Sequence, residues 1–485
     1  MVNTKFQAII LAAGKSTRFN TNSTKLGAVV CGQEMIVYPA KLFANLTIPI
    51  TFIVGYQKEI IKEIITRHAI PQTTFIEQEV QRGTGHAVLC TKDAWSADTI
   101  IIMNGDMPLV NDAIITNLLN HHTQTNATIS FVTAHSVDPS LTGYGRVIND
   151  NNQIKIVEAR DFTGDVATDC CINAGIYCIQ KDFLTQALAQ LPPNQKTGEI
   201  YLTDLIALAS SQQKTVETIS APFDQIRGIN TLKELWTAEH IKRSELISYW
   251  MERGVRFSTA HNVHIDLDVT IGAGSFIGAG VLLQKGTRIG VNCTIEAFSI
   301  LKNSVIHDNV TILSHSVITD AEIHNNAQVG PFAHIRNTVI IGAGSVIGNF
   351  VEVNKSMIGA NSKAKHLSYI GNTSMGEQVN IGAGTITCNY NGFTKNVTTI
   401  EDNATIGANN SLVAPVTIGK DAITAAGSVI THNVPAGALA LGRARQTNKD
   451  GYAARLRERY KNKETSELPF VGAIKVHGSS VTEES

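Results

Sequence analysis

The chain has 485 residues, a formal net charge of -1, and 43% hydrophobic against 17% charged residues. One hydrophobic core rarely organises so long a chain, so the length suggests roughly two to four domains. The near-zero net charge excludes a basic field that would attract nucleic acid or an anionic membrane surface. No apolar run in the sequence approaches the ~18 residues that a membrane-spanning helix requires.

The seven cysteines are scattered and never arranged as C-x-x-C. They therefore indicate neither a disulfide framework nor a zinc site. The first residues, MVNTKFQAIILAAGKSTR, have the outline of a short signal peptide, but their apolar run is minimal. A strand followed by a glycine-containing turn explains the same residues better, and we expect a cytoplasmic protein.

The first part of the chain alternates short aliphatic runs with amphipathic segments. The runs are FQAIILAAG, ITFIVGY, TIIIMNGD, ATISFVTA and INAGIYCI, and several are near-continuous, as is typical of buried parallel strands. Segments such as QKEIIKEIITRH and TDLIALASSQQ predict helices between them. This alternation predicts a doubly wound α/β domain over residues 1–229, with ligands at the carboxyl ends of its strands.

The second part changes to a period of six. Residues 232–253 contain neither glycine nor proline and predict one long helix within a linker over 230–254. Aliphatic residues then recur every sixth position, a spacing typical of a hexapeptide solenoid with three faces per coil. The inward positions are Ile271, Ile277, Leu283, Ile289, Ile295 and Leu301, then in new phase Ile306, Ile312, Ile318, Val329, Ile335, Ile341, Ile347 and Val353, and finally Ile400, Ile406, Leu412, Ile418, Thr424 and Ile430.

We therefore predict a left-handed parallel β-helix over residues 255–446. The segment TCNYNGFTKNVTT (387–399) breaks the period, and we expect it to loop out of the coil. The repeat is lost after about residue 446, so residues 447–485 are predicted to form a partly disordered extension.

Two polar segments follow predicted strands in the first part. Residues 11–18, LAAGKSTR, form a turn whose backbone amides could hold phosphate, while Arg18 and Lys25 could neutralise a polyphosphate. Asp106 follows a buried strand, where a carboxylate is costly unless it binds a cation. Taken singly, each segment could also be an ordinary turn or a capping aspartate. The sequence has neither a Walker A loop nor a complete dinucleotide fingerprint.

With Gln78, RGTGHA (82–87) and GYGR (143–146), these motifs resemble the sugar-1-phosphate nucleotidyltransferase family. Its hallmark is an L-x-x-G-x-G-T-R-type loop followed by a lysine. Ser16 stands where that loop usually has a second glycine, and Thr24 stands where a proline commonly precedes the lysine. We expect neither departure to abolish function.

Because a hexapeptide solenoid follows, nearly the whole chain resembles the family of bifunctional N-acetylglucosamine-1-phosphate uridyltransferases and glucosamine-1-phosphate acetyltransferases. The resemblance implies in-line attack by N-acetylglucosamine-1-phosphate on UTP, with Mg²⁺ held by Asp106 and Asn230 and with Arg18 and Lys25 as catalytic cations. The nucleotide and the sugar would contact Leu11, Ala12, Ala13, Gly14, Lys25, Gln78, Gly83, Thr84, Asn104, Gly105, Asp106, Gly145, Glu158, Asn173 and Asn230.

The solenoid departs from its repeat at chemically useful residues. Arg336 and Asn354 each follow an inward residue and lie one coil apart, so both should face outward about 4.8 Å apart. The phase also turns His366 and Tyr369 outward. The resemblance makes His366 the general base that takes a proton from the amine of glucosamine-1-phosphate as it attacks acetyl-CoA.

The same resemblance implies that the solenoids form homotrimers and that acetyl transfer precedes uridylyl transfer in making UDP-N-acetylglucosamine. The amino sugar phosphate and coenzyme A would contact Arg336, Asn354, Tyr369, Asn380, Ala383, Asn389, Tyr390, Ala408, Ala426 and Arg443. Asn354 stands where a lysine is usual, with Lys355 one place late, so we predict weaker binding of the amino sugar phosphate. Ala408 stands where a serine is common, which puts a hydroxyl contact to coenzyme A in doubt.

Two alternatives remain open from the sequence. One is a nucleotidyltransferase for another sugar or nucleotide, as in ADP-glucose or GDP-mannose synthesis, with a regulatory or oligomerising solenoid. A purely regulatory solenoid has no need of a base, so His366, NIGAGT (380–385) and CNYNG (388–392) argue against it. The other is a non-enzymatic scaffold, which the cluster of Arg18, Lys25, Asp106 and Asn230 disfavours.

Overall fold

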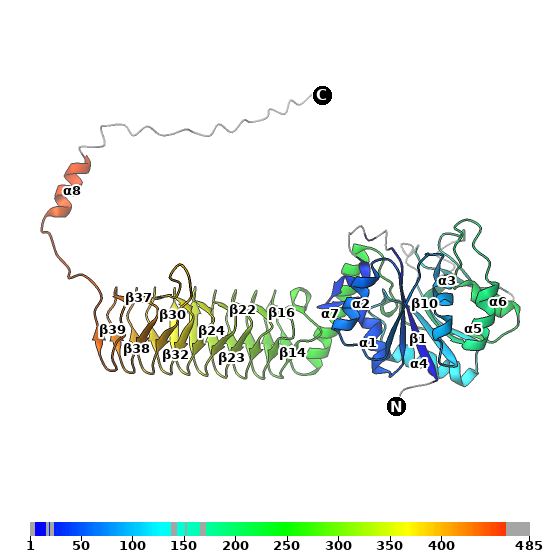
Figure 1. Cartoon of the computed structure of the whole chain (residues 1–485), viewed down its shortest axis with the longest axis horizontal. Coiled ribbons are helices and arrows are strands. Elements are labelled where there is room, and N and C mark those ends of the chain that lie inside the picture. The colour runs from blue at the N-terminus through cyan, green and yellow to red at the C-terminus, as the bar shows by residue number, and fades with distance from the viewer. Residues whose placement is uncertain are drawn as a thin grey trace, which may run out of the picture.

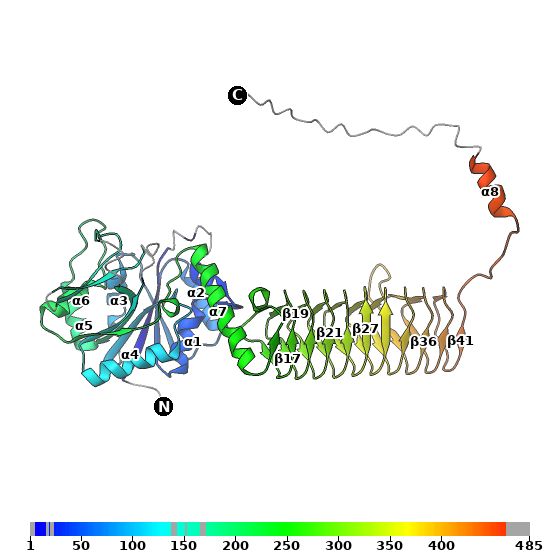
Figure 2. The same cartoon turned by 180° about the vertical axis from the view of Figure 1, so that it is seen from behind.

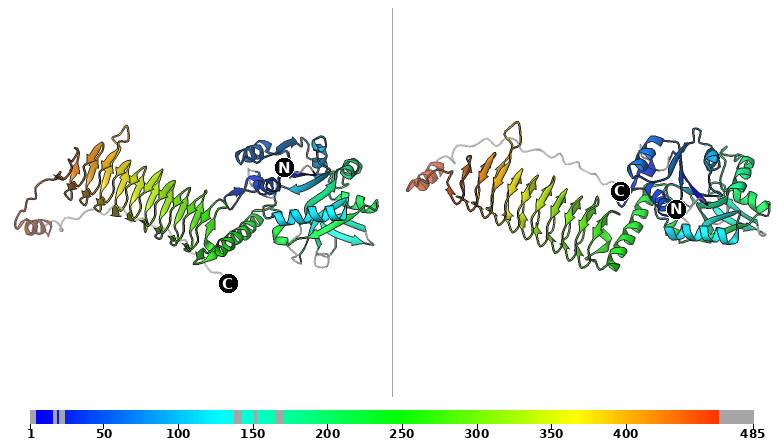
Figure 3. Two further views of the ribbon diagram at one scale, coloured as in Figure 1. Left: turned by 90° about the horizontal axis from the view of Figure 1, so that it is seen from below. Right: turned by 60° about the horizontal axis from the view of Figure 1, so that its bottom comes forward.

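The computed structural model describes residues 5–15, 19, 24–136, 143–150, 153–164 and 171–461. It shows an α/β domain, a long helix α7 (Leu232–Glu252) and a straight solenoid that extends away from the domain (Figures 1 and 2). Figure 3 shows the strands of successive coils stacked side by side along the whole solenoid. Within the described residues, no helix is both long and apolar enough to cross a membrane.

The α/β domain is built on a sheet with the strand order β11-β7-β10-β6-β1-β4-β5. These strands are β1 (Phe6–Ala12), β4 (Ile50–Val54), β5 (Thr73–Glu77), β6 (Thr99–Asn104), β7 (Ile129–His135), β10 (Cys171–Gln180) and β11 (Val216–Ser220). The segment INAGIYCI lies in β10, which runs antiparallel to both β6 and β7. The sequence predicted a strand here but not its direction, because a strand buried on both faces is aliphatic in either direction.

Helices cover both faces of this sheet. They are α1 (Val37–Asn45), α2 (Lys58–Arg67), α3 (Thr84–Cys90), α4 (Asp112–Thr125), α5 (Lys181–Ala187) and α6 (Asp204–Ser211). Successive side chains of β1 point to opposite faces, so Ile10 joins the core that contains Phe43, and Ile9 joins the core that contains Phe131. An antiparallel ribbon of β8 (Arg146–Asp150) and β9 (Gln153–Val157) is attached to β10.

Helix α7 begins with two hydrogen bonds that resemble a capping box, although the second reaches the residue before the N-cap. The Thr231 side chain accepts a hydrogen bond from the Glu234 backbone N–H at 3.2 Å, and Glu234 Oε2 accepts one from the Asn230 N–H at 2.8 Å. The far end of the helix packs Ile247 into the core of the solenoid. Helix α7 therefore joins the α/β domain to the first coils while fixing the backbone at Asn230.

The solenoid is made of three parallel sheets, one for each face of the coil. We call them the first sheet (β12, Arg256–Phe257, to β41, Leu439–Ala440), the second sheet (β13, His264–Ile265, to β40, Val429–Ile430) and the third sheet (β14, Thr270–Ile271, to β38, Val416–Ile418). All the inward residues predicted from the six-residue period are buried. Equivalent inward residues pair in register, as Leu283, Leu301 and Ile318 do. These residues form one continuous core, so the predicted β-helix is confirmed.

The predicted break in the repeat is also a loop in the structure. The chain leaves the coil after β34 (Ile386–Cys388) and re-enters it at β35 (Thr398–Ile400), and the intervening residues stand out from the solenoid (Figure 1). In the C-terminal extension, the structure contains an exposed helix α8 (Tyr452–Lys461) that the sequence analysis did not predict. The rest of the predicted extension, residues 462–485, lies outside the described residues.

Candidate functional site

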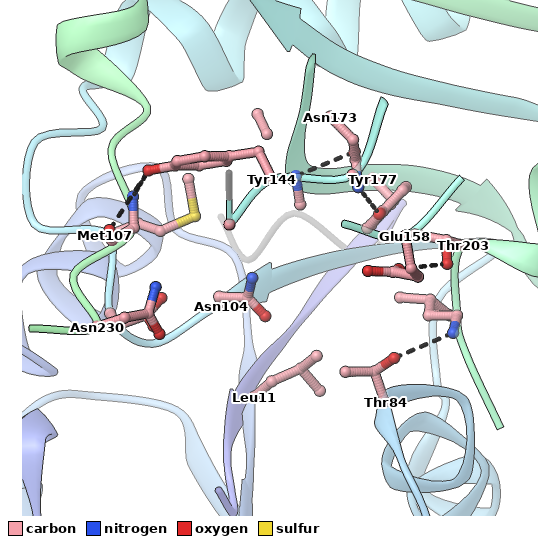
Figure 4. Close-up of a pocket in the computed structure, with 17 residues that line it drawn as sticks. Leu11, Thr84, Asn104, Met107, Tyr144, Glu158, Asn173, Tyr177, Thr203 and Asn230 are labelled. Carbon is pink, nitrogen blue, oxygen red and sulfur yellow. Dashed lines mark hydrogen bonds between the residues drawn. The ribbon is translucent and has the colours of Figure 1, made fainter. Parts of the chain in front are cut away.

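A cavity of about 310 Å³ opens at the carboxyl ends of β1 and β6. Its lining contains eight residues predicted from the sequence: Leu11, Thr84, Asn104, Asp106, Gly145, Glu158, Asn173 and Asn230. Figure 4 shows Asn230 and Met107 on one side of the cavity, Glu158 and Asn173 on the other, and Asn104 between them. The sequence prediction missed Met107, Tyr144, Tyr177, Leu202 and Thr203, which also line the cavity.

Two of the cavity residues, Asp106 and Asn230, come from distant segments, and their side-chain oxygen atoms converge on the ammonium group of Lys25. The Lys25 ammonium forms an ion pair with Asp106 Oδ2 and donates a hydrogen bond to Asn230 Oδ1 at 2.9 Å. Asp106 Oδ1 is buried and accepts no hydrogen bond from any described residue. Lys25 therefore lies against both side chains that the sequence proposed as Mg²⁺ ligands, and a carboxylate oxygen remains available for an ion. This donor set fits a hard divalent cation.

The opposite wall of the cavity is held by hydrogen bonds between side chains. Asn173 Nδ2 donates to the Tyr177 hydroxyl at 2.6 Å, and the Thr203 hydroxyl donates to Glu158 Oε1 at 2.6 Å. Tyr144 accepts a hydrogen bond from the Gly228 N–H at 3.0 Å. Burial raises the pKa of Tyr144 to about 12, so its hydroxyl stays protonated at neutral pH. The Tyr144 side chain can therefore hold the loop that contains Gly228.

The predicted phosphate-binding turn follows β1 at the edge of the cavity. The Ala13 carbonyl accepts a hydrogen bond from Gln81 Nε2 at 2.8 Å, and the Leu11 carbonyl accepts one from the Gly105 N–H at 3.0 Å. Ala12 lies in β1, and Gly14 lies in the turn, where no described residue comes within 4 Å of the position that a Cβ would take. The turn is therefore tied to two neighbouring loops, whereas Arg18 lies outside the described residues.

A second glycine-containing loop precedes α3. Gln78 Nε2 donates to the Gly83 carbonyl at 3.1 Å and lies 3.0 Å from His86 Nδ1. Gly83 has a φ of +97°, and a Cβ there would lie 2.5 Å from the Ile200 carbonyl oxygen, so this position requires glycine. The Thr84 hydroxyl accepts a hydrogen bond from the Leu202 N–H at 3.0 Å, which places α3 against the cavity.

In the solenoid, His366 ends β30 (Lys363–His366) and is exposed. Its Nδ1 lies 2.9 Å from Oδ1 of Asn349, which occupies the same register position one coil earlier at the end of β27 (Val346–Asn349). Because an amide oxygen only accepts hydrogen bonds, Nδ1 carries a proton and Nε2 of the neutral ring keeps its lone pair. The sequence prediction missed Asn349, although its spacing of one coil from His366 was a usable signal.

The three alanines predicted beside coenzyme A share the register position of His366. The pairing of β30 with β33 (Asn380–Ile381), then β36 (Thr405–Ile406) and β39 (Ile423–Thr424), places them one after another along the next three coils. In chain order they are Ala383, Ala408 and Ala426. Arg443 Nη1 donates to the Ala426 carbonyl at 3.0 Å. A column of small side chains therefore leads from His366 to an arginine.

Arg336 and Asn354 pair in register in β25 (His334–Arg336) and β28 (Glu352–Asn354), as predicted. Asn354 is only 3% exposed, and its Oδ1 accepts a hydrogen bond from Asn337 Nδ2 at 2.9 Å. The predicted stacking with Arg336 is therefore present, but Asn354 is covered rather than open to solvent, because its side chain bonds to a neighbouring corner residue. Lys355 is exposed at the corner itself, with a φ of +49°.

Arg336 also has a partner that the sequence did not reveal. Its Nε donates to Glu352 Oε1 at 3.0 Å, and Glu352 pairs in register with Tyr369 in β31 (Tyr369–Gly371). On the second sheet, Arg336 and Asn354 therefore share one register row, and Glu352 and Tyr369 share a second row two residues away, beside the corner that carries His366.

The remaining predicted residues differ in exposure. Asn380 is exposed. Tyr390 lies in the loop and is 61% exposed, and its hydroxyl donates a hydrogen bond to the Gly392 carbonyl at 2.7 Å. Asn389 is buried and donates to Asn372 Oδ1 at 2.8 Å. Tyr390 and Asn380 can thus meet a ligand as the structure stands, whereas Asn389 chiefly fixes the base of the loop.

Three family models match the chain. The MobA-like NTP transferase domain matches residues 8–168, the hexapeptide repeat of succinyl-transferase matches residues 268–313, and the bacterial transferase hexapeptide (six repeats) matches residues 320–355 and 398–432. The chain is therefore a transferase that joins a nucleotidyltransferase domain to a hexapeptide β-helix.

Curated relatives named "Bifunctional protein GlmU" cover nearly the whole chain. The protein of Exiguobacterium sibiricum is 39% identical over 451 residues, which are 92% of this chain and 99% of the relative. The protein of Thermotoga maritima is 38% identical over 455 residues, 93% of this chain and 99% of the relative. The protein of Clostridium kluyveri is 38% identical over 450 residues, 92% of this chain and 97% of the relative.

The chain belongs to the bifunctional GlmU family, which confirms the resemblance seen in the sequence. It is an enzyme with a uridyltransferase and an acetyltransferase activity, its substrates are small molecules, and its nucleotidyltransferase domain uses a divalent metal ion. A purely regulatory solenoid and a non-enzymatic scaffold are thereby excluded.

Proposed function

We propose that the solenoid transfers the acetyl group of acetyl-CoA to glucosamine-1-phosphate, and that the α/β domain then transfers a uridylyl group from UTP to N-acetylglucosamine-1-phosphate. The product, UDP-N-acetylglucosamine, is a precursor of peptidoglycan and lipopolysaccharide. The enzyme would act in the cytoplasm, where UTP and acetyl-CoA are available. The observation that carries the proposal is His366 held by Asn349 at 2.9 Å, beside a column of alanines.

In the α/β domain, Asp106 and Asn230 would hold Mg²⁺, because both present oxygen atoms to the Lys25 ammonium and Asp106 Oδ1 has no other described partner. Bound there, the ion neutralises charge on the triphosphate. Lys25 adds a second positive charge from the same cavity wall, and we assign Arg18 the same role. The attacking sugar phosphate is already ionised, so no protein base is required.

The other cavity residues would fix the two substrates in line for attack. Glu158 and Asn173 would bind the sugar, because Thr203 and Tyr177 hold their side chains in place. Asn104, Gly105 and Gly145 complete the sugar side. The turn at Leu11, Ala12, Ala13 and Gly14, with Gln78, Gly83 and Thr84, would bind the nucleotide.

In the solenoid, His366 Nε2 would take a proton from the amine of glucosamine-1-phosphate. The amine nitrogen attacks the thioester carbonyl, the carbon–sulfur bond breaks, and coenzyme A leaves as a thiolate that is then protonated. Arg336 would bind the sugar phosphate, and Tyr369, in the other row, would contact the sugar. Asn354 lies beside Arg336 in register and would border the same phosphate position. Asn380, Asn389 and Tyr390 would contact the sugar and the acetyl group, while Ala383, Ala408, Ala426 and Arg443 line the coenzyme A path.

We further propose a homotrimer that assembles through an exposed aromatic ladder. We use this name for Phe298, His315, Phe332 and Phe350, whose rings stack in successive coils at centroid distances of 5.2, 5.0 and 5.3 Å. The three phenylalanines are 52, 48 and 57% exposed. All four residues have positive φ, a costly conformation for bulky side chains that an interface would compensate.

The ladder continues into the acetyl-transfer residues. Leu367, which is 62% exposed, follows it at the next corner and is adjacent to His366 in the chain. A partner subunit seated on the ladder would therefore lie next to His366 and could complete its pocket.

A substrate-resolved assay tests the proposed function. The enzyme is incubated with glucosamine-1-phosphate, acetyl-CoA and UTP, and free thiol and pyrophosphate are followed separately. Both should appear, and omission of acetyl-CoA should stop pyrophosphate release unless N-acetylglucosamine-1-phosphate is supplied. Equal pyrophosphate release with glucose-1-phosphate, or with ATP or GTP in place of UTP, would show that the substrates are misassigned.

A further inference from the structure

Two histidines and one glutamate meet on the third sheet, away from both proposed sites. His307 Nε2 lies 2.8 Å from Glu322 Oε1, and His324 Nε2 lies 3.4 Å from the same oxygen. One donor atom from each residue lies within 4.8 Å of the other two. The proposed function leaves this cluster without a role.

The coil repeat fixes the three side chains in position. Ile306 and Ile323 pair in register and point into the core, so the residues that follow them, His307 and His324, occupy equivalent positions in successive coils. Glu322 precedes Ile323 in β23 (Ala321–Ile323) and lies on the outer face of the same strand. Backbone hydrogen bonds of 2.9 Å from the N–H groups of both histidines tie them to the coils that follow. The donor atoms are thus mounted on rigid strands.

We propose that His307, Glu322 and His324 bind a divalent transition-metal ion of the Zn²⁺ class. Imidazole nitrogens with one carboxylate are the ligands that Zn²⁺, Ni²⁺ and Cu²⁺ prefer, whereas Mg²⁺ prefers oxygen alone. Tetrahedral bonds of ~2.0–2.2 Å place ligand atoms roughly 3.3–3.5 Å apart. The distances from Glu322 to the two histidines, 2.8 and 3.4 Å, are near this range, and all three donor atoms lie within 4.8 Å of one another.

The cluster is accessible and separate from the acetyl-transfer residues. The side chains of His307, Glu322 and His324 are 39, 42 and 41% exposed. The aromatic ladder lies at the corner between the first and second sheets, so the third sheet is the opposite face of the coil. Three protein ligands leave one coordination position of a tetrahedral ion open for water.

An ion bound to His307, Glu322 and His324 would join two coils. We expect the bound ion to stabilise the solenoid, since metal binding contributes to folding free energy.

Metal titration of the full-length enzyme tests this proposal. Chelator-treated protein is held in excess Mg²⁺, so that the α/β domain is saturated, and is titrated with Cu²⁺ as a paramagnetic probe and with Zn²⁺. We expect one tight site per chain, nitrogen hyperfine structure from two imidazoles in the Cu²⁺ spectrum, and a higher melting temperature with Zn²⁺. The affinity should fall as the pH is lowered, because protons compete with the metal ion for the ligand atoms.

Matched variants locate the site. His324→Gln should weaken binding at least tenfold and remove one nitrogen from the Cu²⁺ spectrum. His432→Gln changes another exposed solenoid histidine, whose Nδ1 contacts only the Thr431 hydroxyl among the described residues, and should bind like the wild type. Acetyl transfer by metal-free His324→Gln should equal that of the wild type, which shows that the variant folds. Failure of the wild type to bind, or equal binding by both variants, would mean that the cluster is only a hydrogen-bonded group.

Discussion

At the scale of single residues, the acetyl-transfer proposal depends on how one imidazole is oriented. His366 contacts the Asn349 side chain through Nδ1, so its other ring nitrogen, Nε2, is directed away from this partner. The imidazole of His366 is exposed at a corner, so packing against buried neighbours does not fix its orientation. The side-chain amide of Asn349, in the preceding coil, therefore has to orient the ring.

Replacing Asn349 tests this positioning role. Asn349→Ala should lower kcat for acetyl transfer about tenfold, because one hydrogen bond is worth ~1–1.5 kcal/mol, while KM for both substrates stays near the wild-type value. Asn349→Asp should recover most of kcat and shift the pH profile, since a carboxylate also accepts from Nδ1. Thiol release is the measurement, and unchanged kcat in the alanine variant would contradict the role.

Arg336 and Lys355 compete as candidates for the phosphate-binding cation. Arg336→Ala should raise KM for glucosamine-1-phosphate about ten- to hundredfold, as expected for a lost charged hydrogen bond. Lys355→Ala is the matched control, because this exposed lysine lies one residue beyond the row that contains Arg336. Steady-state kinetics decide between them. A larger effect from Lys355→Ala would assign the phosphate to the lysine.

The sequence predicted some of these orientations and missed others. The six-residue phase placed His366 and Tyr369 outside the coil, because inward and outward positions follow directly from the repeat. It did not predict that Asn354 is covered, since this depends on a hydrogen bond from Asn337 at the corner of the preceding coil. Asn349 and Glu352 were missed because their roles depend on contacts between coils, not on their own segments.

At the scale of elements, the solenoid was predictable and the α/β domain only in part. A buried side chain at every sixth position is a strong local pattern, and it also located the loop between β34 and β35. Strand direction in β10 was not predictable, because the order of strands in a sheet depends on tertiary pairing. The cavity residues from β8 to β10 were therefore harder to place together than those that follow β1 and β6.

The aromatic ladder gives a prediction about assembly. The double change Phe332→Ser and Phe350→Ser should raise the concentration at which the trimer dissociates by more than tenfold, since burying one phenylalanine is worth ~2 kcal/mol. Phe393→Ser is the matched control, because Phe393 is 92% exposed in the loop that leaves the coil. Sedimentation velocity over a range of concentrations makes the comparison. Equal dissociation of the two proteins would exclude the ladder as the interface.

Helix α4 gives a prediction about pH and stability. Burial lowers the pKa of His122 to about 4, and its Nδ1 lies 2.9 Å from the Ser130 hydroxyl. The unfolded chain binds a proton near pH 6.5 and the folded chain does not, so stability is full above that pH and falls as pH drops toward 4. Urea unfolding of His122→Gln should show a shallower fall over this range. An unchanged slope would contradict the assignment.

At the scale of the whole molecule, the two activities occupy separate parts of one rod-like chain. The coils near His366 and the cavity near Asp106 are separated by the first half of the solenoid and by α7 (Figures 1 and 2). N-acetylglucosamine-1-phosphate must therefore leave one site before it reaches the other. The family assignment followed from the sequence because both halves carry motifs, whereas this separation required the structure.

The central claim is that one chain carries two independent transferases, and a mixing experiment tests it most directly. His366→Ala should release no thiol but should release pyrophosphate normally from UTP and supplied N-acetylglucosamine-1-phosphate. Asp106→Ala should release thiol normally from glucosamine-1-phosphate and acetyl-CoA but should release no pyrophosphate. From glucosamine-1-phosphate, acetyl-CoA and UTP, neither variant alone should make UDP-N-acetylglucosamine, and an equal mixture of the two should. Loss of both activities in either variant, or no product from the mixture, would contradict the account.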